Sequence, residues 1–577
     1  MAKGKNRAIR ERRQKAPSSQ MAPSTGTSLV SAGNKLREGD LAGAKCACAE
    51  ILKGEQAPDK IRMAEPGDPA DVSRLFEEAI QLHQAGQMDR AGPLYRRILD
   101  FDPAHADALH FLGVIAFQKQ DLEEALSLIS RAVEQNPAAP HYHTNLGLVH
   151  QAGGRLDEAA AALNNSLALN PDGLEALSNL AGVLTIQGKI DEAIALCRRA
   201  LEIDPNHADV HSNLGSSLKR QGNWSGAIAS YERAIEIEPN NAAVHNNLGI
   251  SLKGKGDWGA ATVSFQRAIE IEPHNAEAHT NLGIHFNDQN RFDEAIDLCR
   301  RALEIDPNNA DAHNIIGVVM HGQGKYDEAA ECYRASLQIQ PGDAEIRHLL
   351  AACIGGLPDA APDQYVSKLF DKCAGRFDRH LTEILQFKGP QMLRDAVGRL
   401  AGGKEGLRIL DLGCGTGLCG PHFRDMASAL IGVDLSPRMI EKARERGIYE
   451  DLIVGDITES LRGEKGAFDL ILASDVFVYV GNLDQVFAGC RDTLRGEGIF
   501  AFSTEHAEGD SYILRPSARF AHSAAYIKRM AAAHGFSVEI SDEVILRTEH
   551  NMPITGEIFA LRRKDEAPLA RRPAGGG

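Results

Sequence analysis

The sequence lacks several features that mark specialised classes of protein. Its 577 residues contain no uninterrupted apolar run of about 18 residues, so a membrane-spanning helix is not expected. Its 55 glycines and 24 prolines are too few for a collagen-like or wholly disordered chain. The basic segment Met1 to Lys15 has no apolar run of the kind that a signal peptide carries. We therefore expect a cytoplasmic protein of ordinary globular composition.

Basic clusters and metal-binding cysteine patterns are also scarce. The chain has 63 Lys and Arg against 79 Asp and Glu, a net charge of −16, which does not suit a surface that wraps nucleic acid. The ten cysteines are scattered, and the near neighbours Cys46/Cys48 and Cys414/Cys419 do not have zinc-ligand spacing. We predict free thiols, no metal site, no membrane partner and no nucleic acid as the main partner.

A period of 34 residues runs through the first half of the chain. Prolines keep this spacing without a slip at Pro103, Pro137, Pro171, Pro205, Pro239, Pro273, Pro307 and Pro341. Small residues recur with the same period, from Gly113 to Gly317 and from Ala91 to Ala329. Each unit reads as two amphipathic helices that approach closely at the small residues, and its proline ends the second helix. One unit cannot bury its apolar face alone, so we expect eight units over residues 72–343 to stack as a solenoid.

The repeats resemble tetratricopeptide (TPR) repeats. The unit over residues 242–275 carries the residues typical of that family, namely Leu248, Gly249, Ala261, Phe265, Ala268 and Pro273. The repeats are most similar to those of O-linked GlcNAc transferases, which also read "NLG" in the first helix. The resemblance implies an all-α superhelix with a groove that binds a protein or peptide.

Two sets of polar residues, which we call the histidine column and the asparagine column, recur with the 34-residue period. Histidines recur at His143, His211, His245, His279 and His313, and we interpret them as packing residues in the place of a bulky aromatic side chain. Asparagines recur at Asn145, Asn179, Asn213, Asn247 and Asn281, each just before the leucine of the first helix. An amide matches the donor and acceptor of a peptide backbone, and the transferase arrays use an asparagine ladder here. We predict that this column binds peptide; the alternative is a solvated polar face.

Composition places the domain boundaries. Residues 1–24 read as a disordered basic tail, and residues 25–71 as a degenerate repeat and linker. Residues 344–364 read as a capping helix and linker, broken at Gly355-Gly356, and the segments on either side are expected to fold independently. Residues 365–564 form the second predicted domain, and residues 565–577 a disordered tail.

The second domain alternates apolar β-rich runs with helical stretches. Near-continuous apolar runs at 408–412, 429–433, 452–454 and 468–473 suit strands buried on both faces. Helical stretches at 419–427, 437–446 and 483–494 separate them, which indicates a parallel, doubly wound sheet. A fifth strand is expected at 498–504, and two more at 537–546 and 556–562 around a turn.

The chemistry is predicted at the first strand-to-helix turn. A strand ends at Asp411, and glycines at alternate positions over residues 413–417 let a ligand approach the backbone. Asp411 can receive an ammonium group, Asp434 ends the second strand and can take two ribose hydroxyls, and Asp456 ends the third and can accept an adenine amino group. An amino acid, a ribose and an adenine in that order describe S-adenosylmethionine (SAM). Gly415, Gly417 and Gly420 also fit the pattern of dinucleotide binders, which leaves NAD as the alternative.

Residues 365–564 resemble the class I SAM-dependent methyltransferases, which implies an α/β Rossmann-like domain. The matching segments are LDLGCGTG at 410–417 and GVDLSPRMIEKARERG at 432–447, and the order of the chain resembles methyltransferases that carry TPR repeats. The terminal two-strand hairpin also favours SAM over NAD. The resemblance implies a cofactor site made of Asp411, Gly413, Gly415, Gly417, Asp434, Asp456 and Ile457. Residues 368–381 resemble the helix that folds over the cofactor in small-molecule methyltransferases.

No single catalytic residue stands out. Methyl transfer needs alignment and exclusion of water, and it needs a base only if the nucleophile is protonated. Candidates follow the fourth and fifth strands or lie on the next helix: Ser474, Asp475, Tyr479, Glu505, His506, His522 and Tyr526. Each also has a structural interpretation, such as a helix cap for Asp475 and lid packing for Tyr479.

Three functional hypotheses remain open from the sequence. The first is a SAM-dependent methyltransferase whose TPR array binds a protein or peptide. The second is an interaction scaffold with a silent SAM-binding domain. The third is a small-molecule methyltransferase that uses its repeats for assembly.

Overall fold

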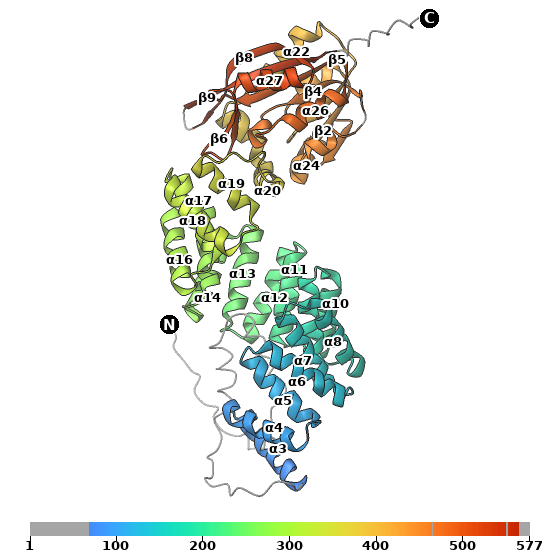
Figure 1. The fold of residues 1–577 in the computed structure, drawn as a ribbon, viewed down its shortest axis with the longest axis vertical. Helices are drawn as coiled ribbons and strands as arrows, with labels where there is room; N and C mark the ends of the chain where they lie inside the picture. Colours follow the sequence, from blue (N-terminus) through green and yellow to red (C-terminus); the bar gives the residue numbers. More distant parts are fainter. Residues whose placement is uncertain (1–68, 464, 550–551, 565–577) are drawn as a thin grey trace, which may run out of the picture. The chain divides into compact units, whose positions relative to one another are not determined.

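The computed structural model describes residues 69–463, 465–549 and 552–564. The expected basic tail 1–24, nearly all of the degenerate repeat and linker 25–71, and the tail 565–577 lie outside the described residues. The chain divides between Leu282 and Gly283 into two compact units, each with its own set of internal contacts. An all-helical repeat array is followed by a mixed α/β domain, as the sequence predicts (Figure 1).

The first unit consists of helix pairs, each joined by a short turn. Its helices are α3 (Pro69–Gln84), α4 (Met88–Phe101), α5 (Ala106–Gln118), α6 (Leu122–Gln135), α7 (Pro140–Ala152), α8 (Leu156–Leu169), α9 (Leu174–Ile186), α10 (Ile190–Ile203), α11 (Ala208–Arg220), α12 (Trp224–Ile237), α13 (Ala242–Lys255) and α14 (Trp258–Ile271). Helix α15 (Ala276–Asp288) crosses the division between the units. The buried side chains lie along the faces that each helix turns to its neighbours, because no single pair can cover its own apolar surface.

The periodic glycines lie where the two helices of a pair approach most closely. A Cβ atom built on Gly113 would lie 2.5 Å from Cγ1 of Ile129, and one on Gly249 would lie 2.7 Å from the ring of Phe265. No side chain fits at such distances without moving the partner helix. The prediction that the small residues allow this close approach is confirmed.

The histidine column makes a hydrogen bond in addition to the predicted packing. In all five repeats, Nε2 of the histidine forms a hydrogen bond with the carbonyl oxygen of the proline six residues earlier, at 2.8–3.4 Å. The proline follows the end of the preceding helix, where carbonyl groups lack partners within the helix. The histidines therefore connect the start of one repeat to the end of the one before it by a hydrogen bond, and two of them, His143 and His279, are also buried.

The second unit begins with the last repeat helices and continues into the α/β domain. Its helices are α16 (Phe292–Ile305), α17 (Ala310–Gly322), α18 (Tyr326–Ile339), α19 (Ala344–Ile354), α20 (Asp363–Cys373), η2 (Ala374–Arg376), α21 (Phe377–Arg379), η3 (His380–Ile384), α22 (Gly389–Ala401), α23 (Gly420–Phe423), η4 (Arg424–Met426), α24 (Pro437–Glu445), α25 (Ile457–Ser460), η5 (Phe477–Tyr479), α26 (Asp484–Thr493) and α27 (Ala524–Ala533). No helix among the described residues is long and apolar enough to cross a bilayer.

A seven-stranded sheet forms the core of the α/β domain. Its strands are β1 (Leu407–Leu412), β2 (Ala427–Asp434), β3 (Asp451–Val454), β4 (Phe468–Ala473), β5 (Leu494–Glu505), β8 (Phe536–Glu549) and β9 (Met552–Arg563), in the order β3-β2-β1-β4-β5-β9-β8. Strands β1 to β5 run parallel to one another, and β9 runs antiparallel to β5 and β8. Strands β1 and β4 lie at the centre, so the residues that follow them are next to each other at one edge. This is the fold class that the sequence predicts.

Two local expectations are wrong. The helix expected over 419–427 is only α23 followed by η4, because strand β2 already begins at Ala427. A small sheet of β6 (Tyr512–Leu514) and β7 (Phe520–His522) lies where the sequence shows only short runs. His522 therefore belongs to β7 and not to the following helix, which begins after Ser523, whose Oγ accepts a hydrogen bond from the backbone N–H of Tyr526.

The last repeat helices pack directly on the α/β domain. Leu349 of α19, Val366 of α20 and Phe520 of β7 are buried in one apolar cluster. Two histidines add hydrogen bonds to the β6–β7 turn. Nε2 of His348 forms a hydrogen bond with the carbonyl oxygen of Ala518 at 3.1 Å, and Nε2 of His321 forms one with the carbonyl oxygen of Pro516 at 2.5 Å. The helix break at Gly355-Gly356 is thus spanned by a buried contact, which its sequence does not reveal.

Candidate active site

The glycine loop joins β1 to α23 and needs its glycines. Gly413, Gly415 and Gly417 have φ angles of +62°, +54° and +83°, which residues with a Cβ rarely adopt. A Cβ on Gly413 would also lie 2.5 Å from Cγ2 of Val476. Gly413 and Gly415 line a cavity, whereas a Cβ on Gly417 would meet the ring of Tyr449 at 2.9 Å. The first two glycines expose backbone to a ligand, and the third allows packing beneath the loop.

Asp411 is a buried carboxylate with an incomplete set of partners. It lies in β1 and is 1% exposed. The hydroxyl of Tyr449 donates to its Oδ2 at 2.7 Å, while its Oδ1 is buried without a hydrogen-bond partner among the described residues. Burial raises the pKa of Asp411 to about 7. A cationic group in the cavity would supply the missing donor and favour the ionised form.

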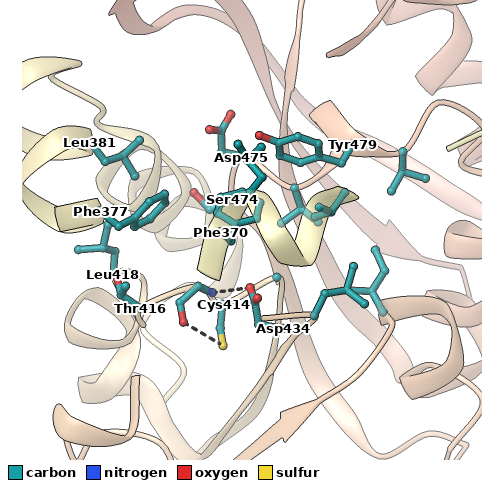
Figure 2. A pocket seen from close by; sticks show the side chains of 18 of the residues that line it. Phe370, Phe377, Leu381, Cys414, Thr416, Leu418, Asp434, Ser474, Asp475 and Tyr479 are labelled. Atoms are coloured by element: carbon teal, nitrogen blue, oxygen red, sulfur yellow. Dashed lines mark hydrogen bonds between the residues drawn. The ribbon is translucent and has the colours of Figure 1, made fainter. Parts of the chain in front are cut away.

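Asp434 is held rigidly at the end of β2. Its Oδ2 accepts the backbone N–H of Gly415 at 2.9 Å (Figure 2). Its Oδ1 accepts the backbone N–H of Ser436, also at 2.9 Å. Burial raises its pKa. A carboxylate offers about four lone-pair sites, so each oxygen can still accept a ligand hydroxyl.

Asp456 follows β3 and lines the same cavity. Its Oδ1 accepts the backbone N–H groups of Thr458 and Glu459, so that the side chain caps the short helix α25. The next residue, Ile457, is buried and also lines the cavity. The structure therefore brings the carboxylates predicted from three different strands to a single hollow.

The hollow is a cavity of about 1060 Å³ above the ends of the parallel strands. The segment from α20 to η3 contributes its other wall, including Phe370, Phe377 and Leu381 (Figure 2). We call this segment, residues 363–384, the lid. It is the segment that the sequence predicts to fold over the cofactor.

Two carboxylates fasten the lid to the loops around the cavity. Oδ1 of Asp371 accepts a hydrogen bond from the Ser436 hydroxyl at 2.5 Å, next to Asp434. Asp378 accepts hydrogen bonds from the Thr416 hydroxyl in the glycine loop and from the guanidinium of Arg446. The lid is thus attached to two of the three loops that carry predicted cofactor residues, the glycine loop and the loop after Asp434.

The catalytic candidates separate into two groups. Ser474, Asp475 and Tyr479 line the cavity, on the side away from Asp434 (Figure 2). The cavity lining does not include Glu505, His506, His522 or Tyr526.

The second group has structural contacts. His506 pairs with Glu557 at 3.1 Å, and Nε2 of His522 bonds the carbonyl of Gly481 at 2.9 Å. Burial lowers the pKa of His522 to about 4, so this ring is neutral at physiological pH. The hydroxyl of Tyr526 accepts the backbone N–H of Leu483 at 2.9 Å.

Two arginines of the cavity wall were missed from the sequence. Arg519 lies in the β6–β7 turn and Arg547 on β8, and both line the cavity. Arg547 is 1% exposed and contacts three carboxylates. The only available signal was that Arg547 directly follows the strand predicted at 537–546; a charge within a buried strand is costly unless it is paired.

The asparagine column is largely engaged within the array. Nδ2 of Asn213 donates to Oγ of Ser178 at 2.9 Å, and Oδ1 of Asn247 accepts from Nζ of Lys219 at 2.7 Å. Asn145 and Asn281 likewise bond residues 35 positions earlier. Asn179 is 2% exposed, and its Nδ2 has no partner among the described residues. These amides connect consecutive repeats, so a peptide would have to share or replace those contacts.

Family comparisons agree with both halves of this description. Residues 410–502 match the family model described as "Methyltransferase domain". Models described as tetratricopeptide or TPR repeat match residues 82–147, 144–208, 196–229, 215–256, 276–309 and 310–343. The chain therefore contains a methyltransferase domain and multiple TPR repeats. These matches leave the resemblance to the repeats of O-linked GlcNAc transferases a prediction.

The curated relatives are similar over the α/β domain. An 18S rRNA (guanine-N(7))-methyltransferase of Bos taurus is 32% identical over 77 residues, 13% of this chain and 27% of that protein. A malonyl-[acyl-carrier protein] O-methyltransferase of Salmonella typhimurium is 28% identical, over 24% of this chain and 53% of that protein. A ubiquinone biosynthesis O-methyltransferase of Roseobacter denitrificans is 29% identical, over 24% of this chain and 51% of that protein. The chain thus spans between about a quarter and about half of the length of these relatives.

Solved structures resemble the chain only weakly. The APC/C hetero-tetramer Cut9-Hcn1 is 19% identical with a TM-score of 0.40, over 54% of this chain and 59% of that chain. A tetratricopeptide repeat protein from Parabacteroides merdae is 18% identical with a TM-score of 0.38, over 43% of this chain and 98% of that chain.

Proposed function

We propose that the chain is a SAM-dependent methyltransferase whose TPR array binds a protein or peptide partner. The observation that carries the cofactor assignment is the buried Oδ1 of Asp411, which lacks a donor among the described residues, in a cavity that also holds Asp434 and Asp456. The ammonium group of SAM would donate to Asp411, and its ribose hydroxyls would donate to Asp434. Asp456 and Ile457 would contact the adenine. SAM supplies a methyl group already activated by the sulfonium.

The residues of the cavity provide alignment and exclusion of water. The glycine loop presents backbone to the ligand, and the lid closes over the same space through Asp371 and Asp378. An acceptor held between the lid and Asp475 would meet the methyl group in a site shielded from solvent. The enzyme's main contribution is therefore geometric.

The acceptor can be a small molecule or a group on the repeat-bound partner. Two relatives carry the names of O-methyltransferases of an acyl-carrier protein and of ubiquinone biosynthesis, which favours a slender acceptor. The contact of α19 with the lid helix α20 favours a link between the repeats and the reaction. A nucleic-acid acceptor is disfavoured by the net charge of −16, although one relative is named for rRNA.

The test is methyl labelling with tritiated SAM. The full chain is incubated with a cell extract, and protein and small-molecule fractions are counted separately. We expect label in one fraction, and slower labelling with the Asp434→Ala variant at a SAM concentration that does not saturate it. A wild-type protein that binds SAM but labels neither fraction would support the silent scaffold instead.

A further inference from the structure

Asp475 is held in an unusual backbone conformation at the wall of the cavity. It lies two residues after the end of β4 and has a φ angle of +59°, a region that residues other than glycine seldom occupy. Its backbone N–H donates to Oγ of Ser503 at 2.9 Å. Such a conformation costs free energy and persists only where the surroundings fix it, often at a functional site. The carboxylate lies at the cavity wall together with the hydroxyl of Tyr479 (Figure 2).

Arg547 fixes the direction of this carboxylate. Its Nη1 donates to Oδ1 of Asp475 at 2.7 Å, its Nε to Oε1 of Glu549 at 2.8 Å, and its Nη2 to Glu505. Three bonds from one planar, fully buried guanidinium leave it a single orientation. Asp475 is bound through Oδ1, and among the described residues no partner donates to its Oδ2. One carboxylate oxygen is therefore anchored while the other can accept a proton.

The other titratable groups near this end of the cavity are unsuited to the role of base. Burial raises the pKa of Tyr479 to about 12, so its hydroxyl stays protonated. Glu505 and Glu549 do not line the cavity and are paired with Arg547. Oδ1 of Asp359 already accepts hydrogen bonds from the side-chain amide of Asn482 at 3.2 Å and from the hydroxyl of Tyr512 at 3.3 Å.

The charges around Asp475 balance. Arg515 and Arg519 from the β6–β7 turn and Arg547 from β8 face Glu505 from β5, Glu549 from β8 and Asp475 itself. Within this cluster, three cations match three anions. A neutral O–H or N–H group could donate to the Oδ2 of Asp475.

We propose that Asp475 is the general base of methyl transfer, that Arg547 is the positioning residue which orients it, and that the acceptor is an oxygen or nitrogen nucleophile that carries a proton. This inference rests on the proposed function. The nucleophile's lone pair forms the bond to the methyl carbon as the carbon–sulfur bond breaks, and that bond's electron pair stays on sulfur. The proton of the nucleophile passes to Asp475 and from there to water. A carboxylate acceptor would need no base and would be repelled by Asp475.

Three readouts test the proposal with the full chain. The first is the alkali stability of the tritiated product from a cell extract, because methyl esters release volatile methanol in mild alkali whereas methyl ethers and methylamines do not. The second is the rate of labelling by Asp475→Asn, with SAM affinity measured by calorimetry. The third is the rate of labelling by Arg547→Met compared with that of Arg547→Lys, with SAM affinity measured by calorimetry for both. Asp484→Asn, an exposed carboxylate paired with His534, is the matched control.

We expect alkali-stable label and a fall of about 10²–10⁴-fold in the turnover of Asp475→Asn, the usual range for a general base, with SAM affinity within about twofold of wild type. Arg547→Met should slow labelling at unchanged SAM affinity, because Asp475 loses the donor that orients it, and Arg547→Lys, which keeps a cationic donor, should recover part of the rate. Alkali-labile label, or an Asp475→Asn variant as active as the control, would overturn the inference while leaving the proposed function intact. A wild-type protein that binds SAM and transfers no label would overturn both.

Discussion

The two regions of the chain use their signature residues differently. In the α/β domain, Asp411, Asp434 and Asp456 come from three strands, stand about 22 residues apart or more, and converge on one cavity. In the repeat array, the signature residues recur every 34 positions, and most of them contact the neighbouring repeat. Motif residues that converge indicate a ligand, whereas periodic residues primarily maintain the contact that makes the repeats stack.

The largest effect should come from separating the two regions at the boundary that the sequence marks. A fragment that begins at residue 357 loses Ile346 and Leu349 of α19 from the apolar cluster and exposes Val366 and Phe520. Each buried large apolar side chain contributes about 1.5–3 kcal/mol, so the loss is comparable with the stability of a domain. We expect this fragment to aggregate or to melt far below the compact unit 283–577. Equal melting temperatures in calorimetry would show that the domain needs no repeat helices.

The next largest effect is expected at the cofactor site. Asp434→Ala removes a charged acceptor for two hydroxyls and should weaken SAM binding by about 1.5–3 kcal/mol, which is about 10- to 150-fold. Asp451→Ala, an exposed carboxylate at the other end of the strand β3, is the control. Calorimetry decides the comparison; a folded Asp434→Ala variant with wild-type affinity would contradict the ribose assignment.

Much of this site followed from the sequence, and the reason is local. The order of strand, glycine loop and helix fixes where Asp411 and Asp434 must lie, because the carboxyl ends of parallel strands share an edge. The contacts of Asp475 could not be predicted, since Arg547 is 72 residues away on a strand added at the far side of the sheet. The short strands β6 and β7 were missed because three residues give too little pattern to distinguish from a loop. The hydrogen bonds of the histidine column could not be predicted, because a residue needed for its bulk and one needed for a hydrogen bond recur with the same period.

The asparagine column should show a smaller, graded effect. Replacing Asn179, Asn213 and Asn247 together with Ala should abolish partner capture if the column holds a peptide backbone. It should also lower the free energy of unfolding by about 1 kcal/mol for each side-chain hydrogen bond of these asparagines that is lost within the array. A pull-down with the wild-type chain and a circular dichroism melt measure both.

The matched control for this triple variant is the pair Asn206→Ala and Asn240→Ala, whose amide oxygens accept hydrogen bonds from Arg233 and Arg267. If the triple variant loses stability but still captures the same proteins, the column serves only to join the repeats.

The smallest effect is expected for a single histidine of the column. His245→Ala removes one hydrogen bond of 3.1 Å to the carbonyl of Pro239, at a position that is not fully buried. The free energy of unfolding should fall by about 1 kcal/mol, and a chelator should leave the wild-type melt unchanged. If a chelator lowered the melting temperature, the histidine column would instead bind a metal ion.

The measurement that tests the central claim most directly is a calorimetric titration of the full chain with SAM in two buffers of different ionisation enthalpy. Burial raises the pKa of Asp411 to about 7, and a bound ammonium group favours the carboxylate, so binding should release a proton below that pH. The release should be larger at pH 6 than at pH 8, and at pH 6 it should vanish in Asp411→Asn. Saturable binding without proton release, or the same release in Asp411→Asn, would contradict the assignment of Asp411 to the cofactor.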